Sequence, residues 1–324
     1  MSTLLQVNDL QVQFPAAGSG LFSLRPRKVS AVNGASLHLA AGETLGLVGE
    51  SGCGKSTLAR AILHLNPVAG GQVLFDGIDM AQGSQADIAR LRHETAMIFQ
   101  DPYTALNPRQ RIGDIIAEVL RVQRKVPEAQ VPERVAELLS LVGLRPELAR
   151  RKPRSLSGGQ CQRVGIARAL AVEPRLIIAD ECVAALDVSI QGQIINLLLE
   201  LRERMNLAML FITHDLTVVR RLCDRVAVMY LGRIVEEGPV HEVFDAPRHP
   251  YTAALIQSIA DIDPARRLPE QPLPGEPPSP LHLPTGCAFH PRCTRALPAC
   301  RESQPPTHSL GTRRHTCVHP EPLS

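Results

Sequence analysis

The sequence predicts an α/β protein with a mostly parallel sheet, an α-helical insertion and a small irregular C-terminal extension. Before residue 245, short apolar strands alternate with helix-period segments, a pattern typical of parallel sheets that helices cover on both faces. The stretch at about 102–158 contains helices but no convincing strand. Of the 27 prolines, 14 fall between Pro264 and Pro322, where they disfavour helix and central sheet. We therefore divide the chain into a domain at 1–245, with a helical subdomain at about 102–158, and an extension at 246–324.

The individual elements follow from hydrophobic periodicity. Strands are expected in short apolar or β-branched runs, at Leu4–Val12, Thr44–Val48, Val73–Phe75, Ala96–Phe99, Arg175–Ala179, Ala208–Thr213 and Arg225–Tyr230. Helices are expected where apolar residues recur every three or four positions, at Thr57–Leu65, Ile112–Val122, Pro132–Leu141, Gln162–Ala171 and Ile190–Met205. The proline-rich tail should be an extended linker followed by a small, stapled segment.

Composition excludes several classes of protein. With 324 residues, 44% hydrophobic and 21% charged, the chain can bury a full core and is not wholly disordered. A net charge of +3 is too small to argue for nucleic acid or a membrane surface. The sequence contains no apolar run long enough to span a bilayer and no export signal at its start. We expect a cytoplasmic protein, whose eight cysteines are thiols or metal ligands rather than disulfides.

The residues from Gly49 to Ser56 form a phosphate-binding loop. They fit the pattern G-x-x-x-x-G-K-S/T, continue to Thr57, and lie between a predicted strand and a predicted helix. Glycines let successive backbone N–H groups curl around phosphates, and the helix N-terminus adds a favourable dipole. Lys55 would reach the β- and γ-phosphates, and the Ser56 hydroxyl would ligate Mg²⁺. Cys53, just before the helix N-terminus, is expected to be a reactive thiolate.

Two carboxylates follow an apolar strand later in the chain. Asp180 and Glu181 come directly after Leu176–Ala179, at the edge of the sheet where ligands bind in open α/β folds. Asp180 can hold Mg²⁺ through a water, and Glu181 is placed to polarise an attacking water. An acidic pair after a strand is weak evidence alone, and its value comes from the phosphate-binding loop upstream.

The segment Leu156-Ser157-Gly158-Gly159-Gln160 decides the interpretation. It resembles the LSGGQ signature of the ATP-binding cassette (ABC) ATPases, and further landmarks of that family match in order. Gln100 matches the Q-loop glutamine, Ala185–Asp187 the D-loop, His214 the switch histidine and Phe14 the aromatic residue that stacks on adenine. Such cassettes combine the parallel sheet with an antiparallel β part.

The resemblance implies an ATP- and Mg²⁺-dependent ATPase. The catalytic residues would be Glu181, His214, Gln100 and Lys55, and Mg²⁺ would be held through Ser56, Gln100 and Asp180. The ATP site would comprise Phe14, Gly49, Ser51, Gly52, Cys53, Gly54, Lys55, Ser56 and Thr57, with Ser157, Gly158, Gly159, Gln160 and Asp187 facing the ATP of a paired cassette. Cys161 and Cys182 depart from the family pattern but remove no ligand or catalytic group.

Within the family, the chain looks like the F-type ATPases of dipeptide/oligopeptide importers. The likeness to these importers lies in the runs Gly46–Lys55, Ile98–Arg109, Arg248–Thr252 and Gly286–Cys293. The segments Val188–Gln191 and Met229–Gly232 resemble the F-type subunit more than the D-type. It implies a second, non-identical D-type ATPase, two membrane permeases, an external binding protein, and a place on the cytoplasmic face of the inner membrane. Nickel complexes or glutathione-like peptides are alternative cargoes. A soluble ABC protein acting on ribosomes or DNA is a less favoured alternative, because the chain has one phosphate-binding loop and no sustained heptads.

Four cysteines lie in the proline-rich tail: Cys287, Cys293, Cys300 and Cys317. Their spacings do not fit ordinary zinc knuckles, whereas four thiolates suit a 4Fe–4S cluster. The family extension is similar to ones that hold such a cluster, while zinc and unligated thiols remain alternatives. Because the motif is far in sequence from Lys55 and Glu181, a structural or assembly role is expected. The basic run at Arg150, Arg151, Lys152 and Arg154 is interpreted as a solvated face rather than a nucleic-acid site.

Overall fold

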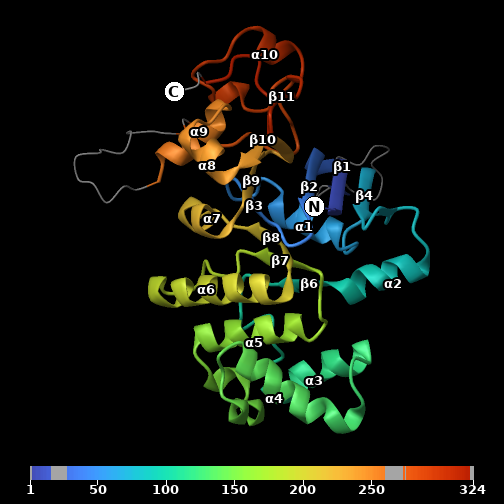
Figure 1. Ribbon diagram of the computed structural model, residues 1–324. Coiled ribbons are helices and arrows are strands. Elements are labelled where there is room, and N and C mark those ends of the chain that lie inside the picture. Colours follow the sequence, from blue (N-terminus) through green and yellow to red (C-terminus); the bar gives the residue numbers. More distant parts are fainter. Residues whose placement is uncertain (1, 16–27, 260–272, 274, 322–324) are drawn as a thin grey trace. The chain divides into compact units, whose positions relative to one another are not determined.

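The computed structural model describes residues 2–15, 28–259, 273 and 275–321, and the chain forms two compact units (Figure 1). The first unit comprises Met1–Leu4, Leu39–Thr44 and Gly83–Ile212. The second comprises Leu5–His38, Leu45–Gln82 and Thr213–Ser324. Each unit therefore combines segments that are distant in sequence. Much of the expected proline-rich linker, residues 260–272 and 274, lies outside the described residues.

Three parallel strands form the sheet of the first unit. They lie in the order β8 (Ala208–Ile212), β7 (Leu176–Asp180) and β6 (Thr95–Ile98). Every residue of β7 and β8 is buried, as expected for apolar strands covered on both faces. This register carries Asp180, the last residue of β7, to the carboxyl edge of the sheet.

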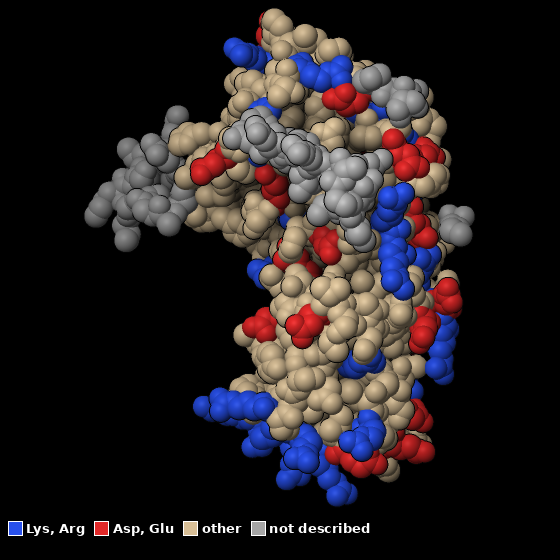
Figure 2. Space-filling view, turned by 90° about the vertical axis from the view of Figure 1, so that its left-hand side faces the viewer, with Lys and Arg blue, Asp and Glu red and all other residues tan. Residues whose placement is uncertain are grey.

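Helices make up the rest of the first unit: α2 (Gln85–Glu94), α3 (Ile112–Gln123), α4 (Val131–Leu141), α5 (Gly158–Leu170) and α6 (Val188–Met205). Single 3₁₀ turns lie at Glu128–Gln130, Pro146–Arg150 and Pro153–Ser155. Helices α3, α4 and α5 pack against one another as the expected helical insertion. Figure 2 shows Lys and Arg at the lower end of the view, where Figure 1 places α3 and α4, with Asp and Glu among them. That mixture fits the expected solvated face.

The second unit contains an antiparallel sheet in the order β2-β1-β4-β5. Its strands are β1 (Thr3–Pro15), β2 (Lys28–Ala40), β4 (Gly70–Phe75) and β5 (Ile78–Asp79). The first two residues of β1 and the last two of β2 belong to the first unit. Buried residues alternate along β2 at Ala35, Leu37 and Leu39. This sheet is the antiparallel β part that the family resemblance implied.

A second group of strands in this unit lies in the order β11-β12-β10-β9-β3. Its members are β3 (Thr44–Val48), β9 (Arg225–Tyr230), β10 (Arg233–Pro239), β11 (His308–Leu310) and β12 (Arg313–His315). Strands β3 and β9 are parallel, and the others pair antiparallel. Helices α1 (Lys55–Ile62), α7 (Leu216–Leu222), α8 (Val240–Asp245) and α9 (Pro250–Gln257) complete it.

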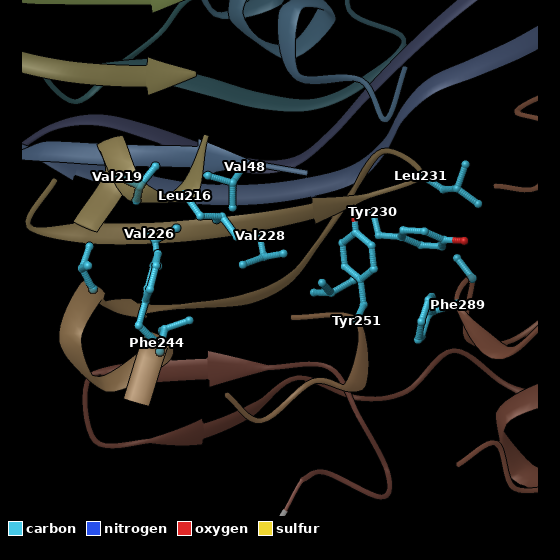
Figure 3. Packing of buried hydrophobic residues seen from close by; sticks show 14 residues of the cluster. Val48, Leu216, Val219, Val226, Val228, Tyr230, Leu231, Phe244, Tyr251 and Phe289 are labelled. Atoms are coloured by element: carbon cyan, nitrogen blue, oxygen red, sulfur yellow. The ribbon is translucent and has the colours of Figure 1, made fainter. Parts of the chain in front are cut away.

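The C-terminal region packs onto this second unit rather than standing apart. Phe289 is 3% exposed and joins the buried apolar cluster that Val48, Tyr230 and Tyr251 also belong to (Figure 3). The sequence-based expectation of a non-helical, stapled tail is wrong in two respects. A short helix, α10 (Ala299–Glu302), forms among the prolines, and β12 adds to the edge of the sheet beside β10. The few apolar residues of the tail, such as Ala288 and Phe289, pack against those of β9 and α9.

The sequence-based boundaries are close for the apolar elements. Strands β3 and β9 match the expected ranges, and α3 and α4 begin and end within one residue of them. The sequence analysis named no range for β2, β5, α2, α7 or any element after β9. Among the described residues, no helix is long and apolar enough to cross a lipid bilayer.

Candidate functional site

The phosphate-binding loop connects β3 to α1, as predicted. Lys55 is 5% exposed, and its ammonium donates to the carbonyl oxygens of Gly49 at 2.8 Å and Glu50 at 2.9 Å. The lysine is thus folded back across its own loop, where these carbonyls take the place that phosphate oxygens would occupy. A buried ammonium needs such acceptors, and a polyphosphate supplies stronger ones.

Gly49 is required where the strand turns into the loop. Its φ is 154°, and a Cβ there would lie 2.2 Å from the carbonyl oxygen of Met229. No side chain fits so close to a neighbouring backbone. The approach of the loop to β9 therefore depends on glycine at this position.

Cys53 departs from the expected reactive thiolate. Its side chain is 5% exposed, and burial raises the pKa of the thiol. The neighbouring Lys55 lowers this pKa, but by less than burial raises it. Desolvation of the anion outweighs the nearby positive charge and the helix N-terminus. The structure therefore places a protonated, shielded thiol in the loop.

His214 follows β8 and lies on the surface of the second unit. The Thr213 N–H donates to the Leu47 carbonyl at 3.2 Å, two residues before the phosphate-binding loop begins. Asp215 caps α7 by accepting from the Thr217 N–H at 2.9 Å. These bonds hold the backbone on both sides of His214 and tie it to the strand that carries the loop. Phe14 lies near the end of β1 and is partly exposed.

Glu181 and Gln100 meet in the first unit. The Gln100 amide donates to the Glu181 carboxylate at 2.9 Å. Glu181 has a φ of 47°, a left-handed backbone conformation that is uncommon for a side-chain-bearing residue. Its N–H donates to the Ile212 carbonyl at 2.9 Å, which fixes this turn at the end of β7. Asp180 precedes it and is 6% exposed.

The signature segment begins helix α5 with a capping box. The Ser157 hydroxyl accepts from the Gln160 N–H at 3.3 Å, and the Gln160 side chain accepts from the Ser157 N–H at 3.1 Å. A Cβ on Gly159 would lie 2.5 Å from the Ile190 side chain, so only glycine fits there. Asp187 occupies the corresponding N-terminal position of α6 and is exposed. Both helices thus begin at the surface, where helix N-termini can receive anions.

The donor set expected for Mg²⁺ has the right chemistry. A hydroxyl, an amide carbonyl and a buried carboxylate, from Ser56, Gln100 and Asp180, are the hard oxygen ligands that this ion prefers. The structure brings Gln100, Asp180 and Glu181 into one unit, and Lys55, Ser56 and His214 into the other. Each half of the predicted site is thus locally assembled.

Three residues that support the loop were missed by the sequence analysis: Glu50, Tyr251 and Arg292. The Glu50 N–H donates to the Tyr251 hydroxyl at 2.9 Å, and the Arg292 guanidinium pairs with the Glu50 carboxylate at 2.6 Å. Tyr251 and Arg292 each lie inside a run that carried the family likeness. Nothing in their spacing pointed to a contact with residue 50, which is 242 positions from Arg292.

The four tail cysteines line one small pocket together with His249, His290 and His319. The Cys287 N–H donates to the Cys300 carbonyl at 2.8 Å, which joins the two ends of this motif. Burial raises the pKa of the Cys287 and Cys293 thiols, and it raises that of Cys317 to about 11. Within the described part of the chain, no group of three or more candidate ligands is arranged to hold a metal ion. The thiols are therefore gathered, but not in the arrangement of a metal site.

Comparison with known proteins agrees with this geometry. Residues 32–184 match the ABC transporter family, and residues 235–300 match the C-terminal region of oligopeptide/dipeptide transporters. The oligopeptide transport ATP-binding protein OppF of Salmonella typhimurium is 49% identical over 99% of this chain and 97% of its own length. The glutathione import ATP-binding protein GsiA of Pectobacterium atrosepticum is 52% identical over 86% of this chain and 45% of its own length.

Among solved structures, a dimeric ATP-binding cassette bound to ADP and Pi in a post-hydrolysis state is similar, with a TM-score of 0.64. It is 27% identical and covers 73% of this chain and 99% of its own. The fold, the motifs and these matches define the class: the chain is an ABC-type ATPase that binds ATP and Mg²⁺. Within that class, it belongs to the ATP-binding subunits that carry the oligopeptide/dipeptide transporter C-terminal region.

Proposed function

We propose that this chain hydrolyses ATP to energise the import of dipeptides or oligopeptides through a membrane ABC transporter. The observation that carries the proposal is a phosphate-binding loop with a buried lysine in a chain that also has the peptide-transporter C-terminal region. Relatives named as oligopeptide and dipeptide transport ATP-binding proteins align over nearly the whole chain.

Lys55 exchanges its two loop carbonyls for the β- and γ-phosphate oxygens when ATP binds. Ser56, Gln100 and Asp180 would hold Mg²⁺, which would supply positive charge to neutralise the phosphates. Phe14 stacks on the adenine, and the loop residues from Gly49 to Thr57 surround the phosphates with backbone N–H groups.

Glu181 orients or deprotonates the water that attacks the γ-phosphate. The hydrogen bond from Gln100 holds its carboxylate in place at the end of β7, and His214 stabilises the charge that develops on the phosphate. Release of Glu181 from Gln100 frees the carboxylate oxygen that accepts the proton of the water.

A second cassette completes the site. The exposed start of α5, with Ser157, Gly158, Gly159 and Gln160, and the exposed Asp187 would face the ATP of a paired subunit. The dimeric form of the similar solved cassette supports this pairing. We propose a non-identical D-type ATPase as the partner cassette. The pair would bind two membrane permeases and, through them, reach an external binding protein. The chain would then lie peripherally on the cytoplasmic face of the inner membrane.

Peptides are the cargo that most of the aligned relatives' names support. The glutathione import relative keeps glutathione-like peptides as a second candidate, whereas nickel complexes have no support among the relatives described above. The matched C-terminal region and the single cassette argue against a soluble protein that acts on ribosomes or DNA.

The transporter assembled with its permeases tests the proposal. Glu181→Gln should retain MgATP binding and lose about 10²- to 10⁴-fold of turnover, because the carboxylate acts in hydrolysis rather than in affinity. ATP-driven uptake of a labelled peptide into proteoliposomes should fall in parallel. Near-normal turnover of this variant in the assembled transporter would exclude the assignment of Glu181.

We also propose that the four tail thiols hold a 4Fe–4S cluster, with zinc as the alternative. Four cysteines at one pocket are the support, while their present arrangement is not that of a metal site. Protein purified without oxygen should contain about four irons per chain and absorb broadly at visible wavelengths. Stoichiometric zinc without iron, from iron-replete cells, would refute the cluster.

A further inference from the structure

The C-terminal region of this chain holds its own phosphate-binding loop at Glu50. Arg292 donates to both carboxylate oxygens of Glu50, at 2.6 Å and 3.0 Å, in a two-point pair. Tyr251 accepts from the Glu50 N–H at 2.9 Å. Both the backbone and the side chain of one loop residue are thus fixed by residues that lie more than 200 positions later in the chain.

The holding residues are themselves rigidly packed. Tyr251 is fully buried, and its ring lies 4.6 Å from that of Tyr230 and 5.3 Å from that of Phe289, between centroids (Figure 3). The Arg292 side chain is 4% exposed and lies over the Tyr230 ring at 5.9 Å. Because these side chains are fixed in the core, the position of Glu50 is set by the core and not by solvent.

The charges of the Arg292–Glu50 pair bear directly on nucleotide binding. Glu50 places a carboxylate in a loop that must receive a polyphosphate anion, and like charges repel more strongly near a protein surface than in bulk water. Arg292 neutralises that carboxylate through two charge-assisted hydrogen bonds. Its own segment lies between Cys287 and Cys293, so the neutralising charge belongs to the cysteine-lined region.

A second segment of the same region also lies beside the loop. Ser51, Gly52 and Cys53 line one pocket together with Glu276 and the prolines at Pro277–Pro280. The Ser30 N–H donates to the Pro280 carbonyl at 3.4 Å, which anchors this proline segment. The loop is therefore flanked by two separate parts of the C-terminal region.

We propose that Arg292 is a positioning residue for ATP binding, which neutralises Glu50 and, with Tyr251, holds the phosphate-binding loop in its receptive form. The C-terminal region then sets the ATP affinity of its own chain, besides any role in assembly. The structural or assembly role expected for the four-cysteine motif stays a prediction beside this one. The proposal rests on the ATP-binding role of the loop described above.

The test measures equilibrium binding of MgATP to the full-length chain, by displacement of a fluorescent ATP analogue. Arg292→Ala should weaken binding about tenfold, in the usual range for coupling between sites, because it leaves the Glu50 carboxylate unneutralised. The affinity of Glu50→Gln alone is measured as the baseline for the double variant. Combined with Glu50→Gln, the Arg292→Ala change should cost less than about threefold, because no carboxylate remains to be neutralised.

Conservative variants separate charge from structure. Arg292→Lys keeps the charge and should restore most of the affinity. Tyr251→Phe removes a single neutral hydrogen bond and should weaken binding by about threefold. If Arg292→Ala does not fold, Arg292→Gln takes its place with the same expectation. Arg301→Ala, a change at an exposed arginine of the same region, is the matched control and should leave the affinity unchanged.

Two outcomes would overturn the proposal. Equal MgATP affinity of wild type and Arg292→Ala would show that the pair does not affect the loop. A loss that persists undiminished in the Glu50→Gln background would show that Arg292 acts through the fold and not through Glu50. Failure of wild-type protein itself to bind MgATP would instead contradict the proposed function, so the two failures are distinguishable.

Discussion

The two units prepare their halves of the ATP site in different ways. In the second unit, Lys55 is buried and Glu50 is held by two residues of the packed core. In the first unit, Gln100 and Ser157 are exposed. Gln100 is hydrogen-bonded to Glu181, and Ser157 to Gln160, so these bonds join residues of the predicted motifs. The predicted phosphate-binding residues are thus held by packed neighbours, whereas Gln100 and the start of the signature segment lie at the surface.

This difference fits what each half must do. A loop that binds phosphates gains affinity when its N–H groups are already oriented, since little ordering is left to occur on binding. A catalytic glutamate and a signature segment that serves a partner's ATP must be able to exchange their bonds during the cycle. Changes at Lys55 should therefore alter affinity, and changes at Glu181 should alter turnover.

The largest expected effect on affinity follows from Lys55→Ala. Removing the ammonium deletes a charge-assisted bond to the phosphates, which should weaken MgATP binding about 10- to 100-fold. Glu181→Gln, in the other unit, serves as the contrast and should bind MgATP within about twofold of wild type. The same displacement measurement on both variants checks the comparison. A similar loss of affinity in both would remove the distinction between the units.

The smallest expected effect concerns the rate at which maleimide alkylates the Cys53 thiol. The loop is closely packed, and the raised pKa of this thiol lowers the thiolate fraction at neutral pH below that of an ordinary cysteine. Maleimide should therefore react slowly at pH 7, and the rate should rise with pH to a plateau above the ordinary pKa of 9.0. Mass spectrometry of labelled peptides, with Cys53→Ser as the control, measures this rate. Rapid labelling of Cys53 at pH 7 would show that the loop opens freely.

Much of the site could be predicted because its motifs are local. The strand Thr44–Val48 is continuously apolar, and the following loop needs glycine at Gly49 whatever surrounds it. The sequence analysis named Gln100 and Glu181 but predicted no contact between them; the pairing of β6 with β7 brings the ends of these neighbouring strands together. Local pattern was sufficient here to name the residues.

Other features depended on signals that were overlooked or are absent from local sequence. The alternation of Ala35, Leu37 and Leu39 could have identified β2, and the capping box of Ser84 and Asp87 could have identified α2. The Arg292–Glu50 pair had no such signal, because a bond between distant residues depends on packing that no local pattern encodes. The thiolate expected at Cys53 was wrong because burial outweighed the charge of the neighbouring lysine.

The distance along the chain between Glu50 and Arg292 has a consequence for biogenesis. A ribosome makes the phosphate-binding loop first, and the arginine that pairs with it is made 242 residues later. Domains complete their folding only when all their segments are available, and this unit draws on the last third of the chain. A truncated or unfinished polypeptide keeps its glycine-rich loop but lacks the residues that hold Glu50. If Arg292 sets the ATP affinity as we propose, such a polypeptide should bind MgATP more weakly than the full-length chain.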